Sequence, residues 1–497
     1  MLPTLLEALG NIARLDVLLV MALGVTVGLI FGIVPGIGGM AALSIFMSFM
    51  WGKDPTLALT FLLAISAATS QGGSVTTILL NVPGDATNAA TLLDGYPMAK
   101  KGMAGRAIGI VLTASALGGL FGGIVLLAAL PFMKQIVMLF GSPETFMMVA
   151  LGLTFTALIA QESLAKGFIA ACLGLMLAFI GLQQVTAVGR FEFNWMYLED
   201  GIDLIPLGLG MFAIPEVIDM MMSGETLIQK AGIREQKAGD VMEGVKDVFR
   251  HLWLTLRCCV LGTIIGIIPG LGAQAATFMS YAHAKQTSKH PEEFGTGAVE
   301  GVIGPESASN SKEGGALLTT LGFGIPGSSS MALLLGAFIV VGVQPGPKML
   351  TEHLDLALWL GWTVIIANVA ASIIMLITAR QMVKITFIDV RFLAPLILAF
   401  VVIGAYAMKE SFIDVLMTFV FGALGYGARR MGYPRVPILL GFILGALAET
   451  YFLISLNTFG PFFFLQPMTF AILMVIVLTV SYEFWSRARR KGARVNA

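Results

Sequence analysis

Long stretches without a charged residue constrain the fold of this chain more than any other feature. A membrane-spanning helix needs about 20 mainly apolar residues, and eight charge-free runs exceed that length. They lie between Asp16 and Lys53, Asp54 and Asp85, Arg106 and Lys134, Lys166 and Arg190, Arg257 and Lys285, Glu313 and Lys348, Asp355 and Arg380, and Glu449 and Glu483. Shorter runs follow Glu144, Arg391, Asp414 and Arg435. Together they predict about ten to twelve transmembrane segments.

The composition agrees with a membrane protein and excludes several other classes. The 497 residues are 57% apolar and only 12% charged, whereas soluble chains carry roughly 25% charged residues. The 30 basic and 30 acidic residues cancel, which leaves no basic excess for binding nucleic acid. We therefore expect an all-α polytopic protein of the lipid bilayer, not a soluble enzyme, a disordered chain or a disulfide-stapled domain.

Two Pro-Gly motifs recur in the same order in the two halves of the chain. Residues 32–39 read GIVPGIGG and residues 266–273 read GIIPGLGA; residues 72–84 read GGSVTTILLNVPG and residues 314–327 read GGALLTTLGFGIPG. The recurrence predicts an internal duplication, with a first membrane repeat at residues 1–223 and a second at residues 251–484. Residues 224–250 carry charges of both signs and are interpreted as a cytoplasmic connector, a solvated loop or surface helix. The basic residues 485–497 are predicted to form a cytoplasmic tail.

A Pro-Gly pair inside an apolar segment has a physical consequence. Proline removes an amide donor and disrupts the helix, and glycine permits backbone angles that other residues avoid. Irregular backbone at membrane depth is tolerated only where protein buries it or where it lines a watery cavity. Broken segments at matching positions in two halves are the best sequence indication of a transporter's binding site. We expect two pseudo-symmetric, inverted repeats with broken or re-entrant helices.

The residues beside these motifs are polar but mostly uncharged. Hydroxyl groups, amides and helix N-termini can hold a carboxylate without lysine or arginine, although serine and threonine also bond to their own helix. The predicted substrate-binding residues are Ser74, Thr77, Asn81, Pro83, Gly84, Asp85, Asn310, Thr320, Pro326, Gly327, Ser328 and Ser329. No catalytic residues and no cofactor are expected.

The first Pro-Gly motif of each half predicts a site for a coupling ion. Unwound carbonyls and helix C-termini are the usual ligands for sodium in broken-helix carriers, and these motifs contain no ionisable side chain. The predicted sodium-binding residues are Gly36, Gly38, Gly39, Gly270, Gly272 and Ala273. Asp85 and Glu306 lie next to the motifs and provide the alternative, which is proton coupling.

The motifs resemble those of a known family. Residues 72–106, GGSVTTILLNVPGDATNAATLLDGYPMAKKGMAGR, and residues 266–347, which end in VGVQPGP, closely resemble the large membrane subunit of tripartite tricarboxylate transporters. The similarity runs over nearly the whole chain. One local departure is the pair Lys312 and Glu313, where small residues are expected in many relatives.

This resemblance implies how the protein works and with what. It implies a multi-pass protein of the bacterial cytoplasmic (inner) membrane that imports a small carboxylate, driven by an ion gradient. It also implies two partners: a small membrane subunit of about four helices and an extracytoplasmic solute-binding protein. The absence of a GxxxxGK[ST] phosphate-binding motif agrees with a secondary transporter, and an elevator-like movement is the preferred form of alternating access.

Two other functions are alternatives. An anion channel would favour a continuous pore lined by polar rings, whereas the polar groups here concentrate at related broken segments. A membrane-embedded enzyme would need acid–base groups such as Glu300, Glu306 and Glu313, but these carboxyl groups have no nucleophile or metal partner in the sequence.

Overall fold

The first half of the chain is almost entirely helical. The computed structural model describes residues 2–34, 38–158, 163–183, 185–223, 238–268, 272–383, 390–407 and 409–495. The elements up to residue 223 are α1 (Leu2–Ile12), α2 (Leu15–Ile33), α3 (Gly38–Ser48), α4 (Pro55–Leu80), η1 (Ala86–Ala89), α5 (Leu92–Lys100), α6 (Ala104–Val137), α7 (Ser142–Leu158), α8 (Leu164–Ala178), β1 (Gly181–Leu182), β2 (Gly189–Arg190), η2 (Met196–Leu198), α9 (Leu204–Gly208), the π-helix η3 (Leu209–Ala213) and α10 (Ile214–Ser223). The two short strands pair antiparallel.

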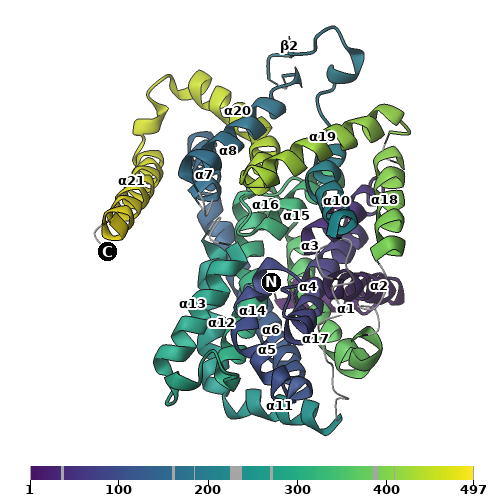
Figure 1. Cartoon of the computed structure of the whole chain (residues 1–497). Coiled ribbons are helices and arrows are strands. Elements are labelled where there is room, and N and C mark those ends of the chain that lie inside the picture. Colours follow the sequence, from purple (N-terminus) through teal and green to yellow (C-terminus); the bar gives the residue numbers. More distant parts are fainter. Residues whose placement is uncertain are drawn as a thin grey trace.

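The described residues of the second half are likewise almost entirely helical. Its elements are α11 (Ala238–Arg250), α12 (Leu252–Ile267), α13 (Gly272–Thr287), η4 (Pro291–Glu293), α14 (Val299–Phe323), α15 (Ser329–Val340), α16 (Pro347–Thr351), α17 (Leu354–Val383), α18 (Val390–Ala407), α19 (Phe412–Arg430), α20 (Arg435–Phe459), η6 (Phe463–Leu465) and α21 (Pro467–Val495). Most of the predicted basic tail continues α21, and its side chains lie outside the described residues. Helix α21 contacts α7 and stands at one edge of the molecule (Figure 1).

Among the described residues, seven segments are long and apolar enough to cross a membrane singly. They are α2, α4, α6, the stretch Leu204–Met222, α17, α19 and α20. The pair Val241–Arg250 and Leu252–Ile267, bent by 78°, would supply an eighth, and five further apolar helices are shorter. This count is below ten to twelve because several of the predicted segments form apolar helices of fewer than 18 residues, such as Leu164–Ala178 in α8 and Ser329–Val340 in α15. The chain is an all-α polytopic membrane protein with broken helices.

Helices α4 and α14 lie in the middle of the molecule (Figure 1). Helix α4 begins in the expected way, because Asp54 Oδ1 accepts a hydrogen bond from Leu57 N at 3.0 Å and Pro55 takes the first helical position. Within the 18-residue apolar stretch of α4, 94% of the residues are buried. Protein rather than lipid therefore surrounds this helix, which explains how it accommodates many hydroxyl groups.

Adjacent glycines let α6 approach two helices at once. Gly118 and Gly122 lie against the backbone of α14, while Gly119 and Gly123 lie against side chains of α17. Because a β-carbon at any of these positions would overlap the neighbouring helix, the four glycines hold α6, α14 and α17 in close contact.

The predicted connector is partly described. Residues 224–237 lie outside the described residues, and the remainder forms α11. Helix α11 packs on α6, where Arg106 Nε donates to Asp247 Oδ2 at 2.5 Å and Gly244 meets the Arg106 carbonyl. Asp247 and Val248 are buried, so α11 is a surface helix with one face held against the membrane helices.

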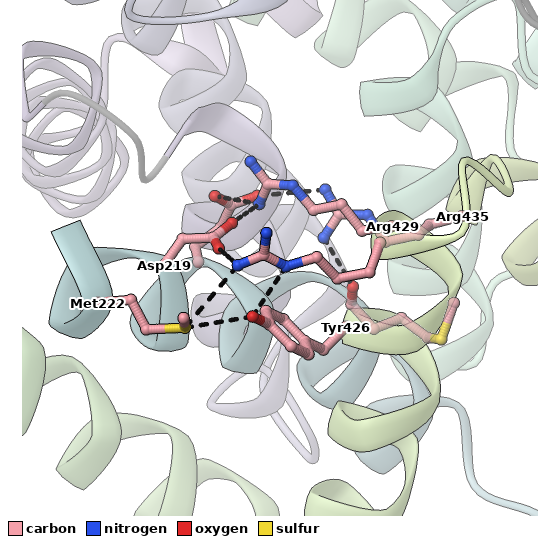
Figure 2. A network of polar contacts seen from close by, with 8 residues as sticks. Asp219, Met222, Tyr426, Arg429 and Arg435 are labelled. Atoms are coloured by element: carbon pink, nitrogen blue, oxygen red, sulfur yellow. Dashed lines mark hydrogen bonds and ion pairs between the residues drawn. The ribbon is translucent and has the colours of Figure 1, made fainter.

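An ionic network joins the end of the first half to α19 and α20 (Figure 2). Glu216 of α10 accepts from Arg429 at 2.9 Å and from Arg435 at 3.2 Å, and Asp219 pairs with Arg429 at 2.7 Å. Arg435 also donates to the carbonyl of Met211 at 3.0 Å. This carbonyl belongs to the π-helix, whose backbone bonds are irregular. The network therefore fixes α10 against the second half.

Candidate substrate and ion site

The second Pro-Gly motif of the first half follows the C-terminus of α4. Asn81 ends the helix in the left-handed conformation, with φ 59° and ψ 28°, which asparagine tolerates better than most residues. Residues 81–85, here called the first tip, then lead into η1.

The corresponding motif of the second half has the same backbone. Gly324 ends α14 with φ 68° and ψ 24°, and it lies 243 residues after Asn81. Residues 324–328, here called the second tip, lead into α15, where Ser328 Oγ accepts from Met331 N at 3.3 Å. The two tips therefore match in position and in backbone conformation.

The first Pro-Gly motif of each half separates two helices. Helix α2 ends at Val34 with φ −76° and ψ 112°, and α12 ends at Ile268 with φ −79° and ψ 112°. The next helices begin at Gly38 with φ 66° and at Gly272 with φ 73°. Residues 35–37 and 269–271 lie outside the described residues, and so do the predicted sodium-binding residues Gly36 and Gly270.

The other predicted sodium-binding residues are placed by the structure. Gly38, Gly39, Gly272 and Ala273 form the first turns of α3 and α13, where the free backbone groups are amides. Carbonyl oxygens face these breaks from the C-termini of α2 and α12 instead. Each break therefore presents donors from one helix and acceptors from the other.

Both tips press against the helices that precede the breaks. A β-carbon at Gly84 would lie 2.8 Å from the carbonyl oxygen of Gly32 and would overlap Gly73. A β-carbon at Gly327 would overlap the Gly266 carbonyl and lie 2.7 Å from Cα of Ala316. Because only hydrogen fits at these two positions, the tips depend on glycine for close backbone approach.

The predicted hydroxyl residues lie on the buried parts of α4 and α14. Thr77 donates to the Gly73 carbonyl at 2.8 Å and Thr320 to the Ala316 carbonyl at 2.7 Å. Both hydroxyl groups therefore bond within their own helix. The Gly84 amide also donates to Thr77 Oγ1 at 3.4 Å, which ties the first tip to α4.

The predicted tip residues differ in exposure. Asn81 and Pro83 are exposed, Asp85 and Ser329 are half-buried, and Gly84, Pro326, Gly327 and Ser328 are buried. The Asp85 amide donates to Asn88 Oδ1 at 3.1 Å, and Asn88 Nδ2 donates to Ser74 Oγ at 2.6 Å. Hydrogen bonds thus connect Gly84 to Thr77 and, through Asn88, Asp85 to Ser74.

Asn310 belongs to a different group of side chains. Its Nδ2 donates to Asn368 Oδ1 at 2.5 Å, and Gln71 Nε2 donates to the Asn368 carbonyl at 3.1 Å. Ser372 donates to Gln71 Oε1 at 3.0 Å. The buried Asn310 Oδ1 has no hydrogen-bond partner among the described residues. Sequence reasoning missed Asn368 and Ser372, although their spacing of four places them on one face of α17.

Glu306 is the buried carboxyl group nearest to the first tip in the hydrogen-bond network. It accepts from Ser74 at 2.9 Å, Thr91 at 2.5 Å and Ser115 at 3.0 Å, and it is 1% exposed. Through Ser74 and Asn88 it connects to the amide of Asp85. The sequence offered Glu306 only as an alternative proton carrier, because its hydroxyl partners come from distant helices.

Asp94 joins the two halves, and sequence reasoning did not single it out. Its Oδ1 accepts from the amides of Gly295, Gly297 and Ala298 at 2.7–2.8 Å, and its Oδ2 accepts from the Tyr281 hydroxyl at 2.9 Å. A charged residue within the quoted 72–106 motif was the available signal. Asp94 therefore anchors the segment that enters α14.

Comparison with known proteins identifies the family of this chain. The model of a family described as the tripartite tricarboxylate transporter TctA family matches residues 18–440. The chain belongs to the TctA family. This family supplies the large subunit of tripartite transporters, so the chain is a multi-pass membrane transporter subunit.

Two relatives of this TctA-family chain come from Agrobacterium vitis. An uncharacterised 52.8 kDa protein of the TAR-I ttuC' 3' region is 35% identical over 439 residues, which cover 86% of this chain and 84% of the relative. An uncharacterised protein of the TAR-II ttuC' 3' region is 40% identical over 190 residues, 38% of this chain and 78% of the relative. No solved structure matches the chain.

Substitutions of Asn81 distinguish two roles: binding of the substrate by its exposed side chain, and shaping of the tip by its left-handed backbone. Asn81→Gly keeps the left-handed backbone, as Gly324 does in the second half, but removes the amide. Asn81→Ala also removes the amide and adds a backbone cost of about 1–2 kcal/mol. If Asn81 binds substrate, both variants should weaken half-saturating uptake by about tenfold. Normal uptake by Asn81→Gly with reduced uptake by Asn81→Ala would show that Asn81 only shapes the tip.

Proposed function

We propose that this TctA-family subunit imports a small carboxylate across the bacterial inner membrane, driven by a sodium gradient. An extracytoplasmic binding protein delivers the substrate, and a small membrane subunit of about four helices completes the transporter. The observation that carries the proposal is the matched pair of broken segments, which share backbone angles at Asn81 and Gly324. Broken segments at corresponding positions form the binding sites of many secondary transporters.

The chemistry of the tips suits a carboxylate. Helix α15 begins at Ser329, directly after its N-cap residue Ser328, and its N-terminus offers the amides of Ser329 and Ser330 together with the positive end of the helix dipole. The first tip offers the exposed Asn81, with the hydrogen-bonded pairs Gly84–Thr77 and Asp85–Asn88 behind it. Such a site binds an anion through amides and hydroxyl groups, without a basic side chain.

The breaks suit a cation. The C-termini of α2 and α12 direct carbonyl oxygens, the negative ends of their dipoles, toward the breaks. Sodium prefers oxygen ligands of this kind in broken-helix carriers. An elevator-like displacement of the block that carries the tips would then expose substrate and ion together to each side.

Uptake into proteoliposomes tests the proposal. A panel of carboxylates is first screened against the purified binding protein, and the carboxylate that binds is used with the reconstituted transporter. We expect an inward sodium gradient to drive accumulation and a pH gradient in sodium-free buffer to drive none. Flux that follows voltage without any coupling stoichiometry would favour the channel alternative.

Variants of the two candidate carboxyl groups sharpen this test. Asp85→Asn and Glu306→Gln keep the shape of each side chain but cannot exchange a proton. Full uptake from a pH gradient without sodium, abolished in either variant, would show that the transporter is coupled to protons.

A further inference from the structure

Residues 181–203, here called the projecting segment, stand out from one end of the molecule. Figure 1 shows β2 of this segment at the end opposite to α11. Three of its large apolar side chains, here called the apolar ridge, are mostly exposed: Phe191 at 61%, Phe193 at 80% and Met196 at 79%. They lie between α8 and the candidate span Leu204–Met222, and so outside both apolar segments. Exposed apolar groups of this kind commonly mark a binding surface.

The distribution of basic residues indicates which side of the membrane the projecting segment faces. Arg429 lies in the last turn of α19, Arg435 begins α20, and Lys166 near the start of α8 donates to the Met431 carbonyl at 2.6 Å. By the positive-inside rule, this end of α8, α19 and α20 is cytoplasmic. The projecting segment follows the opposite end of α8. We therefore infer that it lies on the extracytoplasmic side.

Ion pairs and hydrogen bonds hold the projecting segment against α19 and α20. Arg190 donates to both carboxylate oxygens of Glu449, at 2.6 and 2.8 Å, and Gln183 donates to the same carboxylate at 3.1 Å. The Tyr197 hydroxyl donates to Asp414 at 2.6 Å. Two-point contacts between arginine and a carboxylate fix the geometry of both partners. The apolar ridge is therefore pre-organised, which lowers the entropy lost when a partner binds.

The backbone of the projecting segment is strained at the exposed rings. Six described residues other than glycine have positive φ, and four of them lie here, namely Ala187, Phe191, Phe193 and Asn194 with φ of 53–55°. These left-handed angles are unfavourable for phenylalanine, because its β-carbon crowds the backbone. Strained conformations are concentrated at binding and active sites. The strain thus accompanies the two rings that the segment exposes.

The charge around the apolar ridge favours a protein partner over a lipid surface. The projecting segment carries one basic residue, Arg190, and four acidic ones, which are Glu192, Glu199, Asp200 and Asp203. Glu199 and Asp200 are exposed, whereas Arg190 is paired with Glu449. Anionic headgroups attract basic segments and repel acidic ones. A protein surface with an apolar patch and a basic rim has the complementary charge.

A cavity of about 460 Å³ lies beside the projecting segment. Its lining includes Arg190 and Asp203 of this segment, together with Ile339 and Val340 at the end of α15. Helix α15 begins directly after the second tip. One helix therefore joins the proposed substrate site to the wall of this cavity, and a substrate released beside the apolar ridge enters next to that helix.

We propose that the apolar ridge is the docking surface for the extracytoplasmic binding protein, which presents an apolar patch with a basic rim. The inference rests on the proposed function, in which a binding protein delivers the carboxylate. Aromatic side chains and methionine are enriched at the centres of protein interfaces. The rings of Phe191 and Phe193 supply the apolar contact, and the exposed carboxylates of Glu199 and Asp200 guide the encounter.

Binding of the binding protein to the membrane complex tests this assignment. The full chain and the small subunit are reconstituted in nanodiscs of phosphatidylethanolamine and phosphatidylglycerol, and the purified, carboxylate-loaded binding protein is the probe. Phe191→Gly combined with Phe193→Gly removes both rings but keeps backbone angles that glycine favours, and it should weaken binding at least about tenfold. Glu199→Lys should slow association. Met431→Ser removes an exposed apolar side chain at the cytoplasmic end and should bind like the wild type.

A fluorescent label at position 193 distinguishes a protein partner from lipid. Phe193→Cys is labelled with bimane in a Cys172→Ser background, because Cys172 is the exposed cysteine of the described residues. We expect the emission to change when the binding protein is added, and brominated lipids to leave it unchanged. Quenching by brominated lipids would place the apolar ridge in the bilayer and overturn the proposal.

The outcomes separate this inference from the proposed function. If the wild type binds the binding protein and the combined glycine variant binds it equally well, the docking surface is overturned and the proposed function stands. If the wild type does not bind it, delivery by a binding protein is refuted and the inference falls with it. If the glycine variant does not fold, the label decides: a change of emission on addition of the binding protein supports the surface, and no change overturns it.

Discussion

Valine in place of Gly84 or Gly327 is expected to abolish transport while leaving protein in the membrane. At each position a β-carbon meets backbone atoms of two helices, among them the carbonyl oxygens of Gly32 and Gly266. Backbone cannot move aside as a flexible side chain can, so the tip itself must shift. Overpacking of this kind costs about 1–3 kcal/mol of stability. A displacement of the tip by about 1 Å should lower the rate of transport by about 100-fold.

Uptake and the amount of folded protein are measured together for these variants. Gly10→Val is the matched control, because no atom lies within 4 Å of the β-carbon position at Gly10. It should transport normally. Near-normal uptake by Gly84→Val would contradict the placement of the substrate at the Pro-Gly tips.

Removal of the Asp94 carboxylate should produce the largest loss of stability. Asp94 is fully buried and accepts four hydrogen bonds, three of them from backbone amides. Asp94→Ala leaves these donors unpaired, and each buried donor without a partner costs about 1–3 kcal/mol. We expect the free energy of unfolding to fall by about 3–6 kcal/mol, measured as thermal stability of the purified chain in detergent.

Tyr281→Phe provides the comparison for Asp94→Ala. It removes only the hydroxyl that donates to Asp94 Oδ2, so its effect should be about one quarter to one half of that of Asp94→Ala. Equal stability of Asp94→Ala and the wild type would show that the segment before α14 is held by other contacts.

The sequence predicted the membrane helices because hydropathy and helix disruption are local properties. Charge-free runs locate α2, α4, α6 and α17 without knowledge of their neighbours. The Pro-Gly motifs likewise predicted the ends of α4 and α14, since the residues that disrupt a helix lie at the place where it ends. The recurrence of both motifs in the same order in each half indicated the duplication, because a repeated order can be seen in the sequence alone.

Only the tertiary structure decided which polar groups meet. Ser74 contacts Glu306, Asp94 contacts Gly297, and Asn310 contacts Asn368, and no periodicity in the sequence connects these partners. The sequence marked Lys312 as a departure from relatives, but its burial follows from the packing of α12 on α14. Hydrogen bonds and ion pairs depend on distances between helices, and these distances are set by which glycines allow two backbones to approach.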